Sequence, residues 1–314
     1  MSNENRPADY SPGSLRRVPE SLAGLRLDQA LARMFPEHSR SRLQHWLREG
    51  HIRLDSRAAK PKQKIWGGEQ IEIAPQPDPS GSTHRPERIP LDVVHEDDAV
   101  LVLNKPAGLV MHPGSGNWKG TLLNALLEYA PATAAVPRAG IVHRLDKDTS
   151  GLVVVAKTPE AQTSLVRQLQ ARTVRREYLA LVHGAVKSDG EISGAVGRHP
   201  RERTRMAVVP GGKPALTRYR VAARLEGATL LHCSLATGRT HQIRVHMQSI
   251  GHPLVGDPVY RDRRRSRADP RLAAFPRQAL HAARLSFVHP VSAKPVSFEA
   301  PMPEDLRALL DGLA

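Results

Sequence analysis

The segment Gly140-Ile-Val-His-Arg-Leu-Asp-Lys-Asp-Thr-Ser-Gly-Leu152 places a polar, glycine-bounded loop directly before the apolar run Leu-Val-Val-Val-Ala at 152–156. The apolar run predicts a buried strand. The charged residues of the loop are Arg144, Asp146, Lys147 and Asp148. Charges beside a buried strand cost free energy unless they are paired or face a cleft. Composition alone favours a surface ion-pair loop, and a polar site in a cleft is the alternative.

The chain around this loop, from Leu91 to about Pro303, alternates short apolar runs with fewer helical segments. The apolar runs lie at 99–106, 152–157, 178–186 and 228–236. Helical spacing is clearest at Thr121–Tyr129 and Glu160–Ala171. Short strands joined by Gly and Pro turns, with a few helices, predict an α+β fold. We expect a domain at 91–314 built on a mixed, mainly antiparallel sheet with flanking helices.

A smaller unit precedes this domain. Residues 1–20 are polar and without periodicity, which predicts a disordered lead. Residues 21–74 predict a compact module of two helices and short strands, with Ser39 as the N-cap of the second helix and strands at His51–Leu54 and Gln70–Ile73. Residues 75–90 hold five prolines and few apolar side chains, so we expect an extended linker there.

The small module is strongly basic. Between residues 40 and 64, eight cations stand against only Glu49 and Asp55. The cations are Arg40, Arg42, Arg48, Arg53, Arg57, Lys60, Lys62 and Lys64. Such a surface neutralises phosphates without reading sequence. We predict that this face binds RNA, and a merely solubilising face is the alternative.

The whole chain shares this basic character. Its 314 residues include 46 Lys and Arg against 31 Asp and Glu, which gives a formal charge of +15. That excess favours a polyanionic partner, either nucleic acid or an acidic membrane surface. No window of 18 apolar residues exists and the N-terminus lacks the plan of a secretory signal, so we expect a soluble cytoplasmic protein without a membrane span. The single cysteine, Cys233, lies in an apolar run and is expected to be a buried strand residue rather than a reactive thiol.

Four ordered segments carry a family resemblance. They read Asn104-Lys-Pro-Ala-Gly-Leu-Val-Met-His-Pro113, His143-Arg-Leu-Asp-Lys-Asp-Thr-Ser-Gly-Leu152, Arg176-Glu-Tyr-Leu-Ala-Leu-Val182 and Gly238-Arg-Thr-His-Gln-Ile-Arg-Val-His246. Together they resemble the motifs of the RluA family of RNA pseudouridine synthases, and four ordered motifs are far more specific than one. In addition, residues 26–54 are similar to the S4 RNA-binding module. The usual Asn-Gly turn of that module is here Asp55-Ser56, which predicts a differently shaped hairpin.

The resemblance implies an enzyme that converts uridine to pseudouridine in RNA without a cofactor. It makes Asp146 the catalytic residue and Tyr178 the residue that stacks on the flipped uracil and shuttles a proton. It also suggests that Arg144 fills the space that the flipped base leaves. Lys105 and His112 either line the cleft or are structural. His143, His241 and His246 do not predict a metal site, because no carboxylate or cysteine spacing completes one.

Arg244 is the natural partner of Asp146. Thr240 is expected as the N-cap and Gly251 as the C-terminal stop of a helix that turns Ile243, Met247 and Ile250 inward. The Arg244 cation then lies near the positive end of the helix dipole, where it needs an acidic partner. The family resemblance supplies that partner in Asp146, and a carboxylate in a dry pocket in turn needs a cation to stay charged.

Further segments narrow the expected substrate. Residues 136–148, Arg198-His-Pro200, residues 251–260 and Arg277-Gln-Ala-Leu-His-Ala282 resemble the branch of the family that modifies 23S ribosomal RNA of the large subunit, in the stem-loop of helix 69. The alternatives are a non-catalytic RNA-binding factor of ribosome assembly and a carboxylate-dependent glycosidase with Asp148 as its second acid. We expect the protein to be a monomer with ribosomal RNA as its partner.

Overall fold

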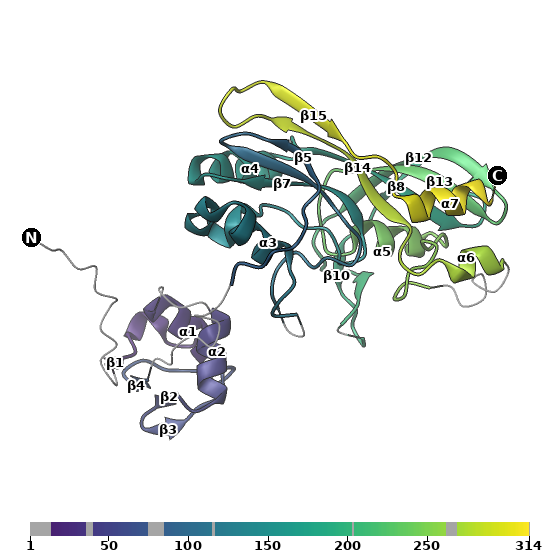
Figure 1. The fold of residues 1–314 in the computed structure, drawn as a ribbon. Coiled ribbons are helices and arrows are strands. Elements are labelled where there is room, and N and C mark those ends of the chain that lie inside the picture. The colour runs from purple at the N-terminus through teal and green to yellow at the C-terminus, as the bar shows by residue number, and fades with distance from the viewer. Residues whose placement is uncertain are drawn as a thin grey trace, which may run out of the picture. The chain divides into compact units, whose positions relative to one another are not determined.

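The computed structural model describes residues 14–35, 40–74, 85–114, 117–202, 204–261 and 269–313 (Figure 1). The chain divides into two compact units, Met1–Thr83 and His84–Ala314. No helix in the described ranges is long and apolar enough to cross a membrane. Each unit has its own hydrophobic core and is described by itself.

The N-terminal unit is a four-stranded sheet with helices packed on it. The strands run in the order β1 (Ser14–Arg17), β4 (Gln70–Ile73), β2 (Ile52–Leu54) and β3 (Arg57–Ala58), and all neighbours are antiparallel. The helical segments are η1 (Glu20–Leu22), α1 (Leu27–Met34) and α2 (Arg40–Arg48). Leu31 of α1, Trp46 of α2 and Ile71 of β4 are fully buried in one cluster, which confirms the module predicted from the apolar spacing.

Two expectations for this unit were wrong. Residues 14–20 are not part of a disordered lead, because Ser14–Arg17 pairs with β4 and so satisfies the backbone groups of that strand. The hairpin at Asp55-Ser56 is also ordinary in its backbone. Both residues have positive φ, 48° and 62°, as a two-residue type I′ turn requires. The Asp55 carboxylate accepts a hydrogen bond from the backbone N–H of Gln70 at 2.8 Å, which helps to hold the turn. The expected N-cap Ser39 lies outside the described residues.

The C-terminal unit is built on a nine-stranded sheet. Its order is β5-β6-β7-β14-β8-β13-β12-β9, with β15 paired to β14. The pairing is antiparallel except between β14 and β7, so the prediction of a mixed, mainly antiparallel sheet is confirmed. The strands are β5 (Val93–Glu96), β6 (Val100–Lys105), β7 (Ser150–Ala156), β8 (Arg175–His183), β9 (Gly190–Ser193), β12 (Leu216–Leu225), β13 (Ala228–Leu235), β14 (Leu280–Val288) and β15 (Pro295–Glu299). A separate ribbon joins β10 (Val196–Arg198) to β11 (Met206–Val208).

Helices cover this sheet on both faces. They are α3 (Leu122–Tyr129), η2 (Pro131–Ala135), η3 (Pro137–Gly140), α4 (Pro159–Ala171), α5 (Gln242–Ser249), α6 (Pro270–Ala274) and α7 (Glu304–Asp311). The predictions at 121–129 and 160–171 correspond to α3, whose N-cap is Thr121, and to α4.

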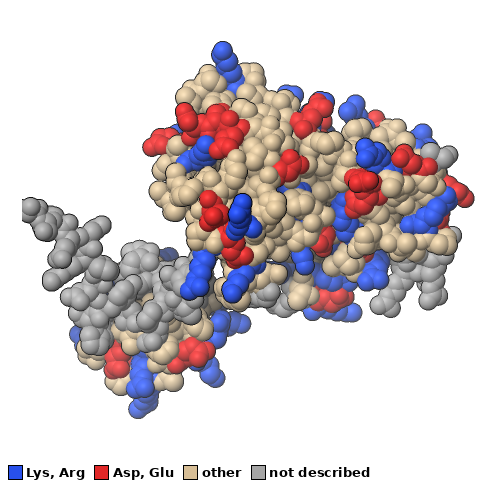
Figure 2. Space-filling view, viewed as in Figure 1, with Lys and Arg blue, Asp and Glu red and all other residues tan. Residues whose placement is uncertain are grey.

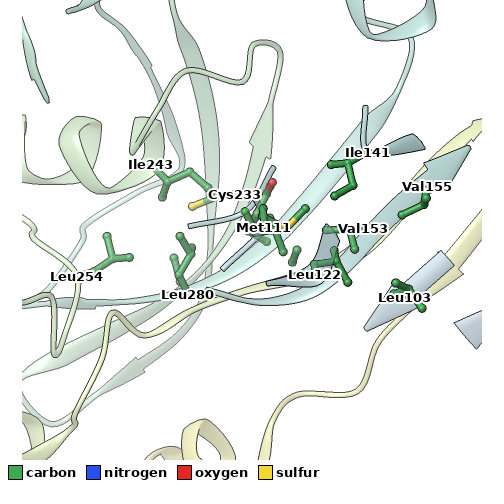
Figure 3. Packing of buried hydrophobic residues seen from close by; sticks show 14 of the residues in the cluster. Leu103, Met111, Leu122, Ile141, Val153, Val155, Cys233, Ile243, Leu254 and Leu280 are labelled. Atoms are coloured by element: carbon green, nitrogen blue, oxygen red, sulfur yellow. The ribbon is translucent and has the colours of Figure 1, made fainter. Parts of the chain in front are cut away.

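The apolar run after the loop is buried on both faces. Val153 and Val155 belong to the cluster that also contains residues of α3 and α5, and Figure 3 shows them near Leu103. Leu152 and Val154 belong to the cluster on the side of α4. Because side chains alternate along a strand, only a continuous apolar run can fill both faces, which is why β7 carries no polar alternation. The β7 run thus anchors the end of the charged loop in the core.

The linker is shorter than predicted. Residues 75–84 lie outside the described residues, but 85–90 belong to the C-terminal unit. The Asn124 side chain donates to the Arg85 carbonyl at 2.9 Å, and the Glu87 N–H donates to the Asn124 carbonyl at 3.0 Å. The Glu87 carboxylate accepts the N–H of Gly120. These contacts place the start of the larger unit at His84 rather than at Leu91.

Candidate active site

Asp146 lies in the loop between η3 and β7, and two buried cations hold the backbone just after it. The ammonium of Lys105 donates to the carbonyls of Pro106, Leu109 and Lys147 at 2.7, 3.0 and 2.9 Å. The guanidinium of Arg277 donates to the Asp148 carbonyl at 3.2 Å. These bonds fix the loop that presents Asp146, whose side chain is only 16% exposed.

An ion-pair chain runs from Asp146 into the protein. Arg244 Nη1 donates to Asp146 Oδ2 at 2.9 Å. The other edge of the same guanidinium is held by Asp257, with Nε–Oδ2 at 2.6 Å and Nη2–Oδ1 at 3.0 Å. The Asp257 side chain is fully buried, and its Oδ1 also accepts the N–H groups of Val259 and Tyr260. Arg244 therefore offers Asp146 a single N–H, and Asp146 Oδ1 is left out of that bond.

The charges in this chain hold one another in their ionised forms. Burial raises the pKa of Asp257, but the bonds to Arg244 outweigh burial and leave that pKa below its ordinary value. Burial likewise lowers the pKa of Arg244, and the two carboxylates more than reverse this. The Arg244 guanidinium also lies 5.0 Å from the centre of the Tyr260 ring, so an aromatic face covers the cation.

His241 and Tyr260 complete the surroundings of Asp146. His241 Nε2 lies 3.8 Å from Asp146 Oδ1, and its Nδ1 lies 2.8 Å from the Tyr260 hydroxyl. Burial lowers the pKa of His241, although the Asp146 charge acts in the other direction. The Tyr260 hydroxyl accepts the N–H of Met206. If a neutral His241 accepts a hydrogen bond from the Tyr260 hydroxyl at Nδ1, its own proton is on Nε2, the atom that faces Asp146.

Tyr178 is a buried residue of β8, 6% exposed, and belongs to the same core cluster as Cys233 and Ile243. Figure 3 shows Cys233 and Ile243 in that cluster. Burial raises the pKa of its phenol; the Arg176 charge opposes this shift and the Asp146 charge adds to it. Tyr178 and Asp146 are therefore electrostatic neighbours. Cys233 is 1% exposed and burial raises its pKa to about 12, so the expectation of an inert, buried thiol is confirmed.

The comparisons with known proteins identify the family. A profile described as RNA pseudouridylate synthase matches residues 99–249, and an S4 domain profile matches 25–71. The ribosomal large subunit pseudouridine synthase D of Nitrosomonas europaea is 58% identical over 94% of this chain and 86% of its own length. The protein of the same name from Xanthomonas campestris is 52% identical over 96% and 93% of the two chains.

The chain belongs to the RNA pseudouridylate synthase family.

A solved structure agrees with this membership. Human RNA pseudouridylate synthase domain containing 1 superposes with a TM-score of 0.57 at 29% identity, over 71% of this chain and 89% of that one. The protein is thus an RNA pseudouridine synthase, as the four motifs predicted, with an N-terminal S4 domain, as the likeness of residues 26–54 predicted. This membership favours an enzyme over the non-catalytic RNA-binding factor.

For a pseudouridylate synthase, the structure brings together three residues that the sequence singled out. Asp146 and Arg244 form the expected ion pair, and the Asp146 charge acts on Tyr178. Arg144 is exposed in the same loop. Asp148 supplies a backbone carbonyl that accepts a hydrogen bond from Arg277. In the described ranges, no group of three His, Cys, Asp or Glu side chains could hold a metal ion.

The cations predicted to bind RNA lie in the separate N-terminal unit. Those whose side chains are described are all exposed (Figure 2): Arg48, Arg53, Arg57, Lys60, Lys62 and Lys64. Arg40 and Arg42 begin α2, but their side chains lie outside the described set. Lys105 does not line a cleft, since it is 1% exposed and its ammonium is used by three carbonyls. Burial lowers its pKa to about 7, against the charges of Asp148 and Asp146.

Some details of the Arg244 helix were wrong. The helix α5 starts at Gln242, and its N-cap is His241, with a left-handed φ of 57°, rather than Thr240. That backbone turn is what aims the His241 ring at Asp146 and Tyr260. Ile243 and Met247 are buried as expected, but Ile250 is 39% exposed because the helix ends before it. Arg244 does lie in the first turn, as predicted.

Sequence reasoning missed Asp257. Its signal was local and modest: an acid between Gly256 and Pro258. Gly256 has a φ of 70°, and a Cβ there would lie 2.1 Å from the Arg277 carbonyl oxygen. Only glycine therefore fits at this position. The family profile ends at residue 249 and so covers Asp146, Tyr178 and Arg244 but not Asp257.

Proposed function

We propose that this pseudouridine synthase modifies large-subunit ribosomal RNA, in the stem-loop of helix 69 of 23S rRNA, with Asp146 as its catalytic residue. The observation that carries the catalytic part is the ion pair between Asp146 and Arg244, 2.9 Å long and nearly enclosed. The names of the curated relatives support the large subunit as the source of the substrate. The likeness of residues 251–260 and 277–282 to that branch supports helix 69.

The reaction breaks the bond between uracil N1 and C1′ of the ribose and forms a new bond from C5 to C1′. The proton on C5 leaves and N1 gains one, so no cofactor or co-substrate is consumed. Asp146 acts in the bond-breaking step in one of three ways: attack at C1′, attack on the base, or stabilisation of positive charge at C1′. Each way needs a charged carboxylate with one oxygen free to face the substrate. The single bond to Arg244 meets that need, since it occupies Oδ2 only.

Tyr178 and Arg144 are proposed to handle the target base. A uridine within a folded RNA must leave its stack to reach Asp146. Arg144, exposed in the same loop, takes the place of the base, while the Tyr178 ring stacks on the uracil. Burial raises the pKa of the Tyr178 phenol further above neutrality, so the hydroxyl carries its proton near pH 7.

The N-terminal unit is proposed to bind the same RNA outside the target site. Its exposed cations neutralise phosphates and raise affinity without selecting a base. A monomeric enzyme in the cytoplasm, where ribosomal RNA is assembled into subunits, completes the proposal.

The test is a map of pseudouridines in ribosomal RNA from cells that lack this protein. We expect sites in helix 69 to be lost, restored by the wild-type protein and not restored by Asp146→Asn. Restoration by Asp146→Asn would sink the catalytic assignment. Loss of sites elsewhere in the large-subunit RNA, with helix 69 intact, would replace the proposed target and leave the assignment of Asp146 in place.

A further inference from the structure

Arg176 is a cation beside the active site that lacks a counter-ion. It lies on β8 two residues before Tyr178, and because side chains alternate along a strand, the two share one face of the sheet. The side chain is half-buried, and its Nε is fully enclosed without any hydrogen-bond partner. Among the described residues, no carboxylate lies within ion-pair distance of it.

Three buried cations of the same unit are, in contrast, all partnered. Arg244 has two carboxylates, and Arg277 is held by both oxygens of Asp305 at 2.7 and 2.8 Å. Lys105 has three carbonyls. Enclosing part of a guanidinium without a partner costs free energy, so a structural role accounts poorly for Arg176.

The surroundings of Arg176 are the elements of the active site. Its charge lowers the pKa of His143, after burial, and opposes the rise of the Tyr178 pKa, so it lies near the Asp146 loop as well as β8. A Cβ on Gly238 would lie 2.5 Å from Arg176 Nη1, so the absence of a side chain at 238 makes room for the guanidinium. Gly238 belongs to the segment that leads into α5 and Arg244.

We propose that Arg176 binds a backbone phosphate of the RNA next to the target uridine. The inference deepens the proposed function, but it rests only on the substrate being RNA. Every nucleotide that reaches Asp146 brings a phosphodiester with it, and the planar guanidinium fork matches a phosphate with two parallel N–H bonds. Substrate binding then supplies the anion that the free protein lacks, and it fixes the flipped nucleotide from the backbone side while Tyr178 contacts the base.

The test measures RNA binding by the full chain in an Asp146→Asn background, which makes it independent of the role of Asp146. The probe is a synthetic helix 69 stem-loop, and total 23S rRNA replaces it if the wild type does not bind the stem-loop. Arg176→Gln should raise the Kd about tenfold and lower the slope of log Kd against log salt by about 0.7. The matched control is Arg175→Gln on the same strand, exposed and turned to the other face, which should change neither quantity. Arg176→Lys should recover part of the affinity, since it keeps the charge and loses the fork.

Two further readouts separate a phosphate contact from a structural role. The unfolding temperature of Arg176→Gln should be unchanged or higher, because an unpaired, half-buried charge is removed. In the stem-loop, a neutral methylphosphonate can replace a phosphate that flanks the target uridine. This replacement should weaken RNA binding by the protein that keeps Arg176 and leave binding by Arg176→Gln unaffected. An unchanged salt slope, equal methylphosphonate penalties in both proteins, or a lowered unfolding temperature would each overturn the proposal. A wild type that binds but forms no pseudouridine in helix 69 would count against the proposed target alone.

Discussion

Asp257 holds Arg244 by two N–H groups, Nε and Nη2, and so leaves only Nη1 to reach Asp146. A guanidinium prefers to meet a carboxylate with two parallel bonds. With Asp257 absent, Arg244 could turn that fork onto both oxygens of Asp146 and occupy the oxygen that the substrate needs. Asp257 therefore acts as a positioning residue, because it sets how Arg244 meets Asp146 without facing the substrate itself.

Replacing Asp257 with Asn should lower kcat about 100-fold, because a misdirected Arg244 misplaces Asp146, while KM changes little. Breaking one side of a buried pair should also cost roughly 3–5 kcal/mol in the free energy of unfolding. Steady-state kinetics and denaturant unfolding measure the two effects. The control is Glu191→Gln, which removes an exposed ion pair with Arg218 and should cost below about 1 kcal/mol with normal kinetics. A variant of Asp257 with normal kcat would contradict the positioning role, whatever its stability.

Tyr178→Phe should bind RNA normally and lose about 10²–10⁴-fold in kcat, because the ring remains for stacking while the proton carrier is gone. Tyr178→Leu should lose binding as well as turnover. Single-turnover assays with saturating enzyme separate the two steps. If Tyr178→Phe turned over at the wild-type rate, the hydroxyl would have no part in proton transfer and stacking would be its whole role.

Removing residues 1–83 should leave an active catalytic unit with weaker, less salt-dependent RNA binding. The reason is that each unit has its own hydrophobic core, and the N-terminal unit carries the basic face, so its loss removes phosphate contacts. Titrations at several salt concentrations measure the slope. A finer version neutralises Arg53, Lys60, Lys62 and Lys64 together in the intact chain. An unchanged slope in both proteins would mean that the basic face does not contact the RNA.

Low pH should weaken the contacts of Asp97 with His95 on β5 and with His289, which directly follows β14. Asp97 Oδ2 lies 2.9 Å from Nε2 of both His95 and His289. Burial raises its pKa, but the N–H groups of Val100 and Ala99 and the two histidines lower it to about 2. A depressed carboxylate pKa contributes stability that is present above the unfolded value, near 4, and is lost as pH falls toward 2.

Asp97→Asn should therefore unfold at a lower temperature than the wild type at pH 6. The gap should close as the pH falls from about 4 to about 2, because the wild-type carboxyl is then protonated as well. Thermal unfolding followed across that pH range measures it. A gap that stayed constant down to pH 2 would show that the carboxylate charge is not what stabilises this corner.

Local sequence patterns were enough to predict the helices and strands whose causes are local. The continuous apolar run of β7 predicted a strand buried on two faces, and the spacing at 121–129 and 160–171 predicted helices, because periodicity records which side chains meet the core. Four ordered motifs then singled out Asp146, Tyr178 and Arg244. Even there, the boundaries that depend on one backbone angle, such as the left-handed His241 before α5, were missed by a residue.

How those residues contact one another depends on the folded chain. Asp146 and Arg244 are 98 positions apart, and local sequence patterns do not encode which oxygen of a distant carboxylate an arginine will reach. The sequence left open whether Lys105 lines the cleft or is structural, and the fold decides it, because loops from two parts of the chain supply three carbonyls to its buried ammonium. Asp257 became visible only as the second partner of Arg244, and Arg176 only by the absence of a described acid near it. The sequence shows which residues are charged, whereas the partner and the burial of each charged residue depend on the whole fold.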